Sequence, residues 1–576
     1  MRRTVEATPS KRGVGVVPQH SAEIPAGETD SVIGTMLRPP LQRLEWLLLA
    51  AFAATSVWVV ALDLWQVVVH GRVWTGTDGV YITDQMQYLS WIVSASHSGL
   101  VANLFVVRSS QPVYLQPAIL LSGLVTAAGV PPTVALLIWK PVAVGAFFFA
   151  TRAYLVRALH QPGVTARVVA LALTLFYGCL APVYGQVGVV GDLFPGFLSW
   201  GYPFALLAVA AAACGLLGYD RARAEGRVSF APGLLGALAG SLHPWQGELF
   251  VLIIVGAELV GGDIRLRDLR PGRLRSPRVR LWSLTIALAA VPLIYYYALG
   301  KLSIDWQLGQ QASKHGGLVV PIAVALAPLA LVALLGLRGS AGGFLGLATR
   351  VWPLAALVIY VQGLTSAGAT PLHAWDGVTL PLAVLAVNGY ARLRAEPRWG
   401  QLLARLRLGS WHRRRWVLLA LIALFTLPAT FEEMREALVE VQPSAGNANF
   451  IQPGEKRALA YLKKNRDRGA VISSPYLGMT VPGYTGRHTY DGDCIWSEPH
   501  CYGRDTTTEA LLAGQLNAAT ARQLISGSGA RFVLLACGSA TGTVESELAP
   551  LTSSVTRFGC ASVIEIRRAT GVMARS

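Results

Sequence analysis

Two carboxylates and three aromatic rings follow the first long apolar run of the chain. The stretch GTDGVYITDQMQYLSWI, residues 76–92, holds Asp78, Tyr81, Asp84, Tyr88 and Trp91. An exposed aspartate has a reference pKa of about 3.9, so it is ionised at neutral pH and can accept a proton. Residues 84, 88 and 91 have the i, i+4 and i+7 spacing of one helical face. This spacing singles out Asp84 as the first candidate for chemistry.

A single lysine lies within the apolar run TVALLIWKPVAVGAFFFA, residues 133–150. A cation at the centre of a membrane helix costs at least about 2.5 kcal/mol on insertion scales, so such residues tend to be paired and functional. Lys140 is predicted to lie one to two turns from the external end of its helix. It can reach the outer headgroups by extending its side chain, or it can bind a phosphate as a point charge.

Other polar residues are expected at the same external side. Asp192 lies in GDLFPG, His243 in SLHPWQGELF, and His373 and Asp376 in PLHAWDG. A cleft that gathers these groups would face outward. Each has a simpler alternative, because a carboxylate in a membrane-edge loop is often only solvated and His243, before a proline, can cap a helix end.

The elements that must position these residues are membrane helices. Mean hydropathy is +0.46, only 14% of the residues are charged, and the apolar runs are continuous rather than alternating. Such runs favour spanning helices, which satisfy their own backbone hydrogen bonds in lipid. We expect about eleven spans, near residues 46–66, 133–153, 168–184, 201–218, 229–243, 245–261, 281–299, 317–336, 351–366, 377–391 and 416–431.

The net charge of +17 is concentrated between particular helices, in loops that include Arg221, Arg223, Arg265, Arg267, Arg413 and Arg414. This is the positive-inside pattern rather than a nucleic-acid surface. It predicts a disordered cytoplasmic tail over 1–43, a polytopic domain over 44–432 with a first external loop over 67–132, and an external segment over 433–576. The apolar stretch 113–129 is expected to lie on the outer membrane surface, because spanning would reverse the later loops.

Residues 433–576 read as a small soluble α/β domain. GEKRALAYLKKN and TTTEALLAGQLNAATARQLI are predicted helices, and GAVISSP, RFVLLAC and ASVIEIR are predicted strands. Four of the six cysteines lie in this segment, which suggests disulfides in an oxidising compartment. Of three possible pairings we favour Cys494 with Cys501 and Cys537 with Cys560; four free thiols are the alternative. No P-loop, dinucleotide-binding or zinc spacing is present.

The order of these parts resembles the GT-C fold glycosyltransferases, polytopic enzymes that use polyprenyl-phosphate sugars. The resemblance lies in one helix, an external acidic loop (TDQMQYLSWI), the surface segment QPVYLQPAILLSGLVTAAG and the basic helix start IWKP. LHPWQG, HAWDGVTLPLAVLA and VPGYTGRHTYDG are similar to pieces of bacterial integral membrane members. Only seven of the 49 basic residues are lysine, a bias associated with high-GC bacterial genomes and so with an actinobacterial source.

The resemblance implies that an external-loop aspartate is the general base, which deprotonates an acceptor hydroxyl while the polyprenyl phosphate leaves with inversion. Asp84 matches that position best, and Asp78 is the reserve. Lys140 would bind the donor phosphate. A divalent metal, Mg²⁺, Mn²⁺ or Ca²⁺, is possible, although the separation of Asp78 and Asp84 differs from the closely spaced acidic pair of the class.

The same resemblance implies a hexosyl- or pentosyltransferase of cell-envelope or cell-wall synthesis in the cytoplasmic membrane. Its partners would be a polyprenyl-phosphate-linked sugar, a glycan, lipid or protein acceptor and membrane lipid, with no nucleic acid. Tyr81, Tyr88, Trp91, His243, Asp192 and His373 would bind substrate. Two other classes stay open: a transporter or flippase for a lipid-linked precursor, and an inactive assembly scaffold.

Overall fold

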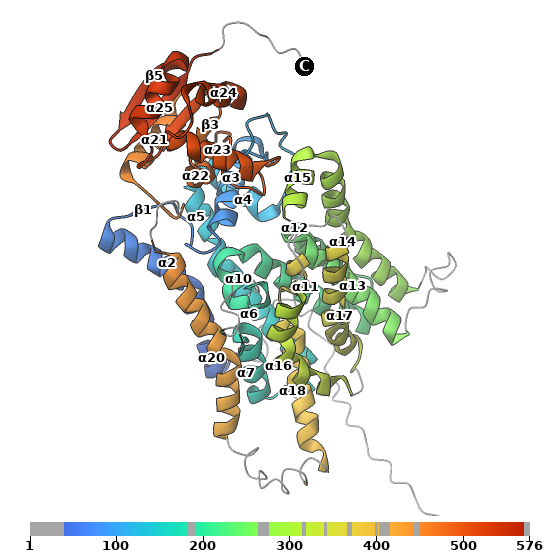
Figure 1. Cartoon of the computed structure of the whole chain (residues 1–576). Coiled ribbons are helices and arrows are strands. Elements are labelled where there is room, and N and C mark those ends of the chain that lie inside the picture. The colour runs from blue at the N-terminus through green and yellow to red at the C-terminus, as the bar shows by residue number, and fades with distance from the viewer. Residues whose placement is uncertain are drawn as a thin grey trace, which may run out of the picture.

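The chain folds into a long helical bundle with a smaller α/β domain at one end (Figure 1). The computed structural model describes residues 40–160, 162–180, 182, 191–262, 276–313, 318–338, 342–365, 371–397, 401, 415–442 and 448–568. The predicted tail lies almost wholly outside these residues, as do most of the basic loop residues.

Eight of the described helical segments are long and apolar enough to cross a membrane, which makes the chain a multi-pass membrane protein. They are α2 (Arg43–His70), the pair α5 (Pro132–Leu137) and α6 (Trp139–Ala158), α11 (Pro203–Ala224), α13 (Pro244–Gly261), α14 (Pro277–Leu302), α16 (Val319–Leu337), α17 (Phe344–Thr365) and α20 (Arg415–Glu440).

The other three predicted spans are helices of the bundle that are too short to cross a membrane by themselves. These are α7 (Val164–Phe176), α12 (Ala231–Leu242) and α18 (Thr379–Ala395), with 13, 12 and 17 residues. At about 1.5 Å per residue they reach roughly 18 to 26 Å, less than a hydrocarbon core of about 30 Å. The segment predicted to lie on the membrane surface contains α4 (Pro117–Ala127), whose 11 residues are also too few to span.

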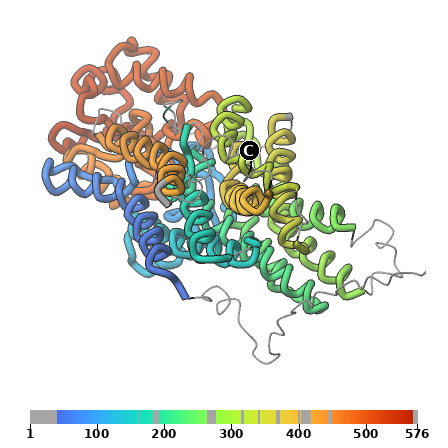
Figure 2. Tube along the Cα trace, turned by 90° about the horizontal axis from the view of Figure 1, so that it is seen from below, coloured from blue at the N-terminus to red at the C-terminus, as the bar shows by residue number. Residues whose placement is uncertain are grey.

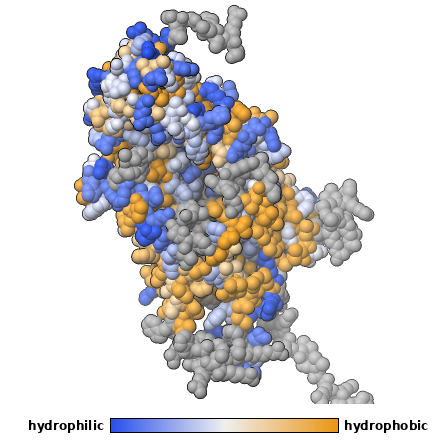
Figure 3. Space-filling model, viewed as in Figure 1, coloured by the Kyte–Doolittle hydropathy of each residue, from blue (hydrophilic) through white to orange (hydrophobic). Residues whose placement is uncertain are grey.

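On the face shown in Figure 3, apolar side chains predominate on the helical bundle and polar side chains predominate on the α/β domain. On α2, for example, Leu47, Trp65 and Val68 are more than half exposed, as expected of a surface that contacts lipid. Seen from below, the α/β domain is displaced toward α2 and away from α13 and α14 (Figure 2).

One group of charged side chains inside the bundle forms a buried ion-pair network. Glu45 of α2 accepts hydrogen bonds from Arg152 of α6 (3.3 Å) and Arg167 of α7 (3.0 Å), and all three side chains are buried. A buried charge that lost its partner would cost several kcal/mol, so these contacts keep the three helices in register.

The α/β domain is built on a four-stranded sheet of order β3-β4-β6-β5. The strands are β3 (Val471–Ser473), β4 (Phe532–Leu535), β5 (Thr552–Phe558) and β6 (Ala561–Ile566), with β3 and β4 parallel and the other pairs antiparallel. Successive residues of β4 alternate between two apolar clusters, because strand side chains point to opposite faces. Helices α21 (Pro453–Lys464), α22 (Pro475–Thr485), α23 (Cys501–Leu512), α24 (Ala518–Ser528) and α25 (Thr541–Leu548) complete the domain.

Two details of this domain differ from the sequence prediction. The single helix expected over residues 506–525 is wrong: it is α23 and α24, because Gly514 takes a φ of +67° and Asn517 caps the second helix through a side-chain bond to the Thr520 amide. Strand β5 was not expected, since TSSVTRF is an exposed edge strand with little apolar character. In addition, α20 continues to Glu440, past the predicted boundary at 432/433.

A short sheet joins the α/β domain to the first external loop. Strand β1 (Val73–Trp74) pairs antiparallel with β2 (Phe450–Ile451). Next to it, the Asn449 amide donates to Asp63 of α2 (2.5 Å) and accepts from the Thr77 hydroxyl (2.6 Å). These bonds hold the acidic stretch of the loop between α2 and the α/β domain.

Candidate functional site

Helix α3 (Ile82–Ser98) carries the acidic stretch and begins at a residue with unusual backbone geometry. Tyr81, its N-cap, has a φ of +53°, a left-handed conformation that costs a non-glycine residue on the order of 1 kcal/mol. Its ring lies 4.9 Å from Phe197 and 4.6 Å from Tyr202. A Cβ on Gly201 would come within 2.5 Å of this ring, so the close packing that fixes Tyr81 requires glycine there.

Asp84 lies in the first turn of α3, three residues after Tyr81, and is half-buried. Its Oδ2 accepts a hydrogen bond of 2.8 Å from the hydroxyl of Tyr202. Tyr202 stands between α10 (Pro195–Gly201) and α11, and its ring lies 5.7 Å from that of His373, edge to face. Tyr202 thus links the carboxylate of Asp84 to His373, which lies far along the chain.

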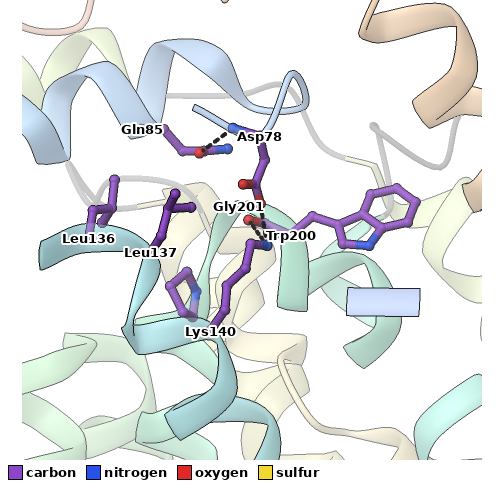
Figure 4. A pocket seen from close by; sticks show the side chains of 8 residues that line it. Asp78, Gln85, Leu136, Leu137, Lys140, Trp200 and Gly201 are labelled. Carbon is purple, nitrogen blue, oxygen red and sulfur yellow. Dashed lines mark hydrogen bonds and ion pairs between the residues drawn. The ribbon is translucent and has the colours of Figure 1, made fainter. Parts of the chain in front are cut away.

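Asp78 and Lys140, which the sequence analysis considered separately, form a buried ion pair (Figure 4). The Lys140 ammonium also donates to the backbone carbonyls of Ser199 and Trp200, both at 2.8 Å. Burial raises the pKa of Asp78, and the positive charge of Lys140 opposes that rise. The Asp78 amide donates to the side chain of Gln85 (2.8 Å), which ties this pair to α3.

A small pocket lies beside this ion pair. Figure 4 shows Asp78 and Lys140 pointing toward one another within it, and its lining comprises Asp78, Gln85, Leu136, Leu137, Lys140, Trp200, Gly201 and Pro203. Its wall thus combines the ion pair with apolar side chains of α5 and the junction of α10 and α11. That junction also carries Tyr202, so the pocket and Asp84 are neighbours.

Two histidines and a carboxylate converge at the ends of three other elements. His243 stands between α12 and α13, and His373 lies in η3 (Pro371–Trp375), with Asp376 directly after it. The Asp376 carboxylate is fully buried, 4.0 Å from Nε2 of His243 and 3.9 Å from Nδ1 of His373. Gln246 donates to the carbonyls of His373 (3.1 Å) and Asp376 (3.4 Å), and so holds the loop in place.

This group fits a divalent cation. One ligand atom from each of His243, His373 and Asp376 lies within 4.8 Å of the others. A buried carboxylate between two imidazoles is a donor set that suits Mn²⁺ or Zn²⁺ better than Mg²⁺ or Ca²⁺, which prefer oxygen ligands. The second such group among the described residues, Cys494, Cys501 and Asp505, has its two thiols bonded to each other.

Tyr88 and Trp91 follow Asp84 along the same face of α3, as the spacing predicts. Tyr88 packs against Phe204, at 5.2 Å between ring centroids. Trp91 lies in an aromatic cluster with Tyr114, Trp306 and Trp496, and only 6% of its surface is exposed. A sugar-binding role for these two rings stays a prediction.

The α/β domain packs directly on α3. The Thr83 hydroxyl contacts the Met479 sulfur (3.6 Å), and a Cβ on Gly483 would lie 3.0 Å from that of Leu89. Asp493, from the same domain, is fully buried and interacts electrostatically with Asp84; burial raises its pKa to about 8. The site therefore lies between the helical bundle and the α/β domain.

Both disulfides have the pairing that the sequence favoured. Cys494 is bonded to Cys501, and Cys537 is bonded to Cys560. The first closes the loop next to Asp493, and the second joins the end of β4 to the turn between β5 and β6. The remaining cysteines, Cys179 and Cys214, are free.

The structure thus gathers the predicted residues into two neighbouring groups. Asp84, Tyr81 and His373 meet around Tyr202, with His243 beside them, whereas Asp78 pairs with Lys140. Asp192 lies in η1 (Gly191–Leu193), and its side chain is outside the described part of the structure. Sequence reasoning missed Tyr202 and Asp493. Neither has a spacing signal, because Tyr202 looks like an interfacial aromatic and Asp493 looks like a turn residue.

Comparison with known proteins identifies the fold. No protein-family model matches the chain, and no curated protein matches it in sequence. The oligosaccharyltransferase AglB of Archaeoglobus fulgidus, solved with a tethered acceptor peptide, matches with a TM-score of 0.50 and 12% identity over 85% of this chain and 68% of AglB. AglB with an inhibitory peptide and a dolichol-phosphate matches with a TM-score of 0.50 and 11% identity, over 85% and 69%.

A third similar structure is ArnT of Cupriavidus metallidurans bound to undecaprenyl phosphate. It has a TM-score of 0.49 and 14% identity, over 91% of this chain and 98% of ArnT. The fold of the chain is therefore the GT-C fold, a polytopic membrane bundle with an appended α/β domain. At these identities the comparisons establish the fold, and the chemistry must be argued from the site.

Proposed function

We propose that this protein is a membrane glycosyltransferase that moves a sugar from a polyprenyl-phosphate donor to an acceptor hydroxyl. The observation that carries the proposal is the placement of Asp84. It stands at the first turn of α3 on a GT-C fold, held by Tyr202 and flanked by the histidine group and the α/β domain. The AglB structure, which contains a dolichol-phosphate, supports a lipid-linked donor for this proposal.

In this mechanism Asp84 is the general base. Its carboxylate accepts the proton of the acceptor hydroxyl while the oxygen attacks the anomeric carbon, and the bond from that carbon to the phosphate oxygen breaks. The attack comes from the face opposite the phosphate, so the anomeric configuration inverts. Tyr202 orients the carboxylate of Asp84 through its hydroxyl, and that carboxylate takes the proton.

The departing polyprenyl phosphate needs positive charge. A divalent cation held by His243, His373 and Asp376 would supply it when bound. Lys140 is the other candidate, but its ammonium is engaged by Asp78 and three backbone carbonyls. Lys140 can bind the donor phosphate only after its ion pair with Asp78 has broken.

The direction of the bundle in the membrane follows from the same proposal. We place the basic loops and the N-terminus in the cytoplasm, and the α/β domain with its two disulfides outside. The acceptor would then be a cell-envelope glycan, lipid or protein at the outer face of the cytoplasmic membrane.

Purified protein in lipid nanodiscs, incubated with a panel of labelled polyprenyl-phosphate hexoses and pentoses and an envelope extract as acceptor, tests this function. We expect sugar transfer from one donor, with a product whose anomeric configuration is opposite to that of the donor. Movement of intact donor across a sealed vesicle, without transfer, would instead indicate a flippase. A product with retained configuration would contradict the single-displacement mechanism.

A further inference from the structure

Asp493 is a carboxylic acid that lies where the α/β domain contacts the helical bundle. It lies in the loop between α22 and α23, and its side chain has no exposed surface. Its Oδ1 accepts a hydrogen bond from the Ile495 amide (2.9 Å), and its buried Oδ2 has no hydrogen-bond partner among the described residues. A fully buried carboxyl with one unengaged oxygen needs a reason, since such a group costs folding free energy.

The loop around Asp493 is held on α3 from several sides. Trp496 packs against Trp91 of α3 and Trp306 of α15 (Ile304–Ala312), at 5.5 and 4.6 Å between ring centroids. The carbonyl of Trp496 accepts from the Asn103 side chain at 2.8 Å. The Cys494–Cys501 disulfide closes the loop directly after Asp493. These contacts therefore fix the position of the loop relative to α3.

The charged groups around Asp493 are few. Asp84 acts on it from α3, and the amides of Ile495 and Trp496 act from its own loop. Helix α15 brings Asp305 to the same aromatic cluster, where it is neutralised by Arg108. Among the described residues, Asp84 is the charged group that acts electrostatically on Asp493. A second negative charge on the buried Asp493 would be unfavourable.

We propose that Asp493 is a positioning residue of the transfer site, a neutral acid that leaves Asp84 as the single ionised carboxylate of the pair. This proposal rests on the proposed function. Below about pH 8 Asp493 is protonated, because burial and the charge of Asp84 raise its pKa. Above that pH it ionises, and the second negative charge disturbs the hydrogen bonding of Asp84 and repels the donor phosphate.

The neighbouring Asp491 is a matched control. It is equally buried, with its pKa also raised to about 8, but its partners are Thr508, Asp505 and Arg504 rather than Asp84. Asp493→Asn and Asp491→Asn therefore remove the same kind of group from the same segment. Only the first removes it from beside the base.

The experiment compares kcat/KM at pH 9 and pH 7 for the wild type and both variants. At pH 9 a group with a pKa of about 8 is ionised in about ten molecules for each one in which it is protonated. The wild-type kcat/KM at pH 9 should therefore be about a tenth of its value at pH 7. Asp493→Asn should largely abolish this fall, whereas Asp491→Asn should keep it. An unchanged alkaline fall in Asp493→Asn, or its loss in Asp491→Asn, overturns the inference but leaves the proposed function standing.

Thermal stability provides a readout that does not need activity. A carboxyl whose pKa is raised in the folded state costs stability as pH rises toward that pKa. Both variants should therefore gain apparent Tm relative to the wild type between pH 5 and pH 9. If Asp493→Asn shows no such gain, Asp493 is not a buried acid of this kind and the inference fails. A wild type that transfers no sugar from any donor would instead overturn the proposed function and the inference with it.

Discussion

Replacement of Lys140 by methionine separates a structural ion pair from a phosphate ligand. Lys140→Met removes the partner of Asp78, whose carboxylate has no exposed surface, and leaves the carbonyls of Ser199 and Trp200 without their donor. Breaking a buried ion pair by removing one member costs about 3 to 5 kcal/mol. Because an unfolding entropy of about 2.1 cal/mol/K per residue is large for a chain of this length, we expect the apparent Tm in detergent to fall by about 2 to 4 °C. Asp78→Leu should also destabilise, because it strands the ammonium.

The double variant Asp78→Leu/Lys140→Met completes a thermodynamic cycle. Removing both charges should recover most of the lost stability, because replacement of a whole buried pair by apolar residues is often close to neutral. Lys301→Met is the matched control, since Lys301 is exposed at the end of α14 and should change Tm little. Stability can be measured as the fraction of monodisperse protein that survives heating, by fluorescence-detected size-exclusion chromatography. If Lys140→Met is as stable as the wild type but raises the donor KM more than tenfold, the structural reasoning is refuted and the phosphate role explains Lys140.

Three further predictions address the site. Tyr202→Phe removes the hydroxyl that orients Asp84 and should lower kcat roughly 3- to 30-fold with little change in donor KM; an unchanged kcat would show that the bond is not catalytic. Serine replacement of Cys494 and Cys501, which close the loop beside Asp493 and Trp496, should lower transfer more than replacement of Cys537 and Cys560, and thiol labelling of intact cells should find all four protected without reductant. Chelation with EDTA should lower activity, with Mn²⁺ restoring it in the wild type but not in His373→Ala, if the histidine group holds a cation; full activity after metal removal would rule out that role.

Much of the fold was predictable because hydrophobicity acts locally. Every predicted span corresponds to a helix, and the spacing of Asp84, Tyr88 and Trp91 was correctly interpreted as one face of α3. The strands β3, β4 and β6 were predictable for the same reason, since buried apolar runs with β-branched residues indicate strands. Helix lengths were harder, because composition does not show where α7, α12 and α18 end inside the bundle.

The site itself was predictable only in part, because its contacts join distant segments. Asp78 and Lys140 were both recognised as unusual, but nothing in a sequence shows that two residues far apart in the chain neutralise each other. Tyr202 was not identified because an aromatic before a proline at a helix start is common at membrane interfaces. Asp493 was not identified because YDGD resembles a turn, and only the packing of α22 and Trp496 on α3 brings it to Asp84.

The central claim is that Asp84 is the base of a sugar transfer, and the transfer rate of Asp84→Asn tests it most directly. Asparagine keeps the size of the side chain and the oxygen that accepts the Tyr202 bond but cannot take a proton at neutral pH. A positioned general base contributes about 10² to 10⁴ in rate, so kcat should fall at least about a hundredfold while protein level and donor binding stay near normal. If Asp84→Asn instead transfers sugar from the preferred polyprenyl-phosphate donor at the wild-type rate, Asp84 is not the base and the mechanism is wrong.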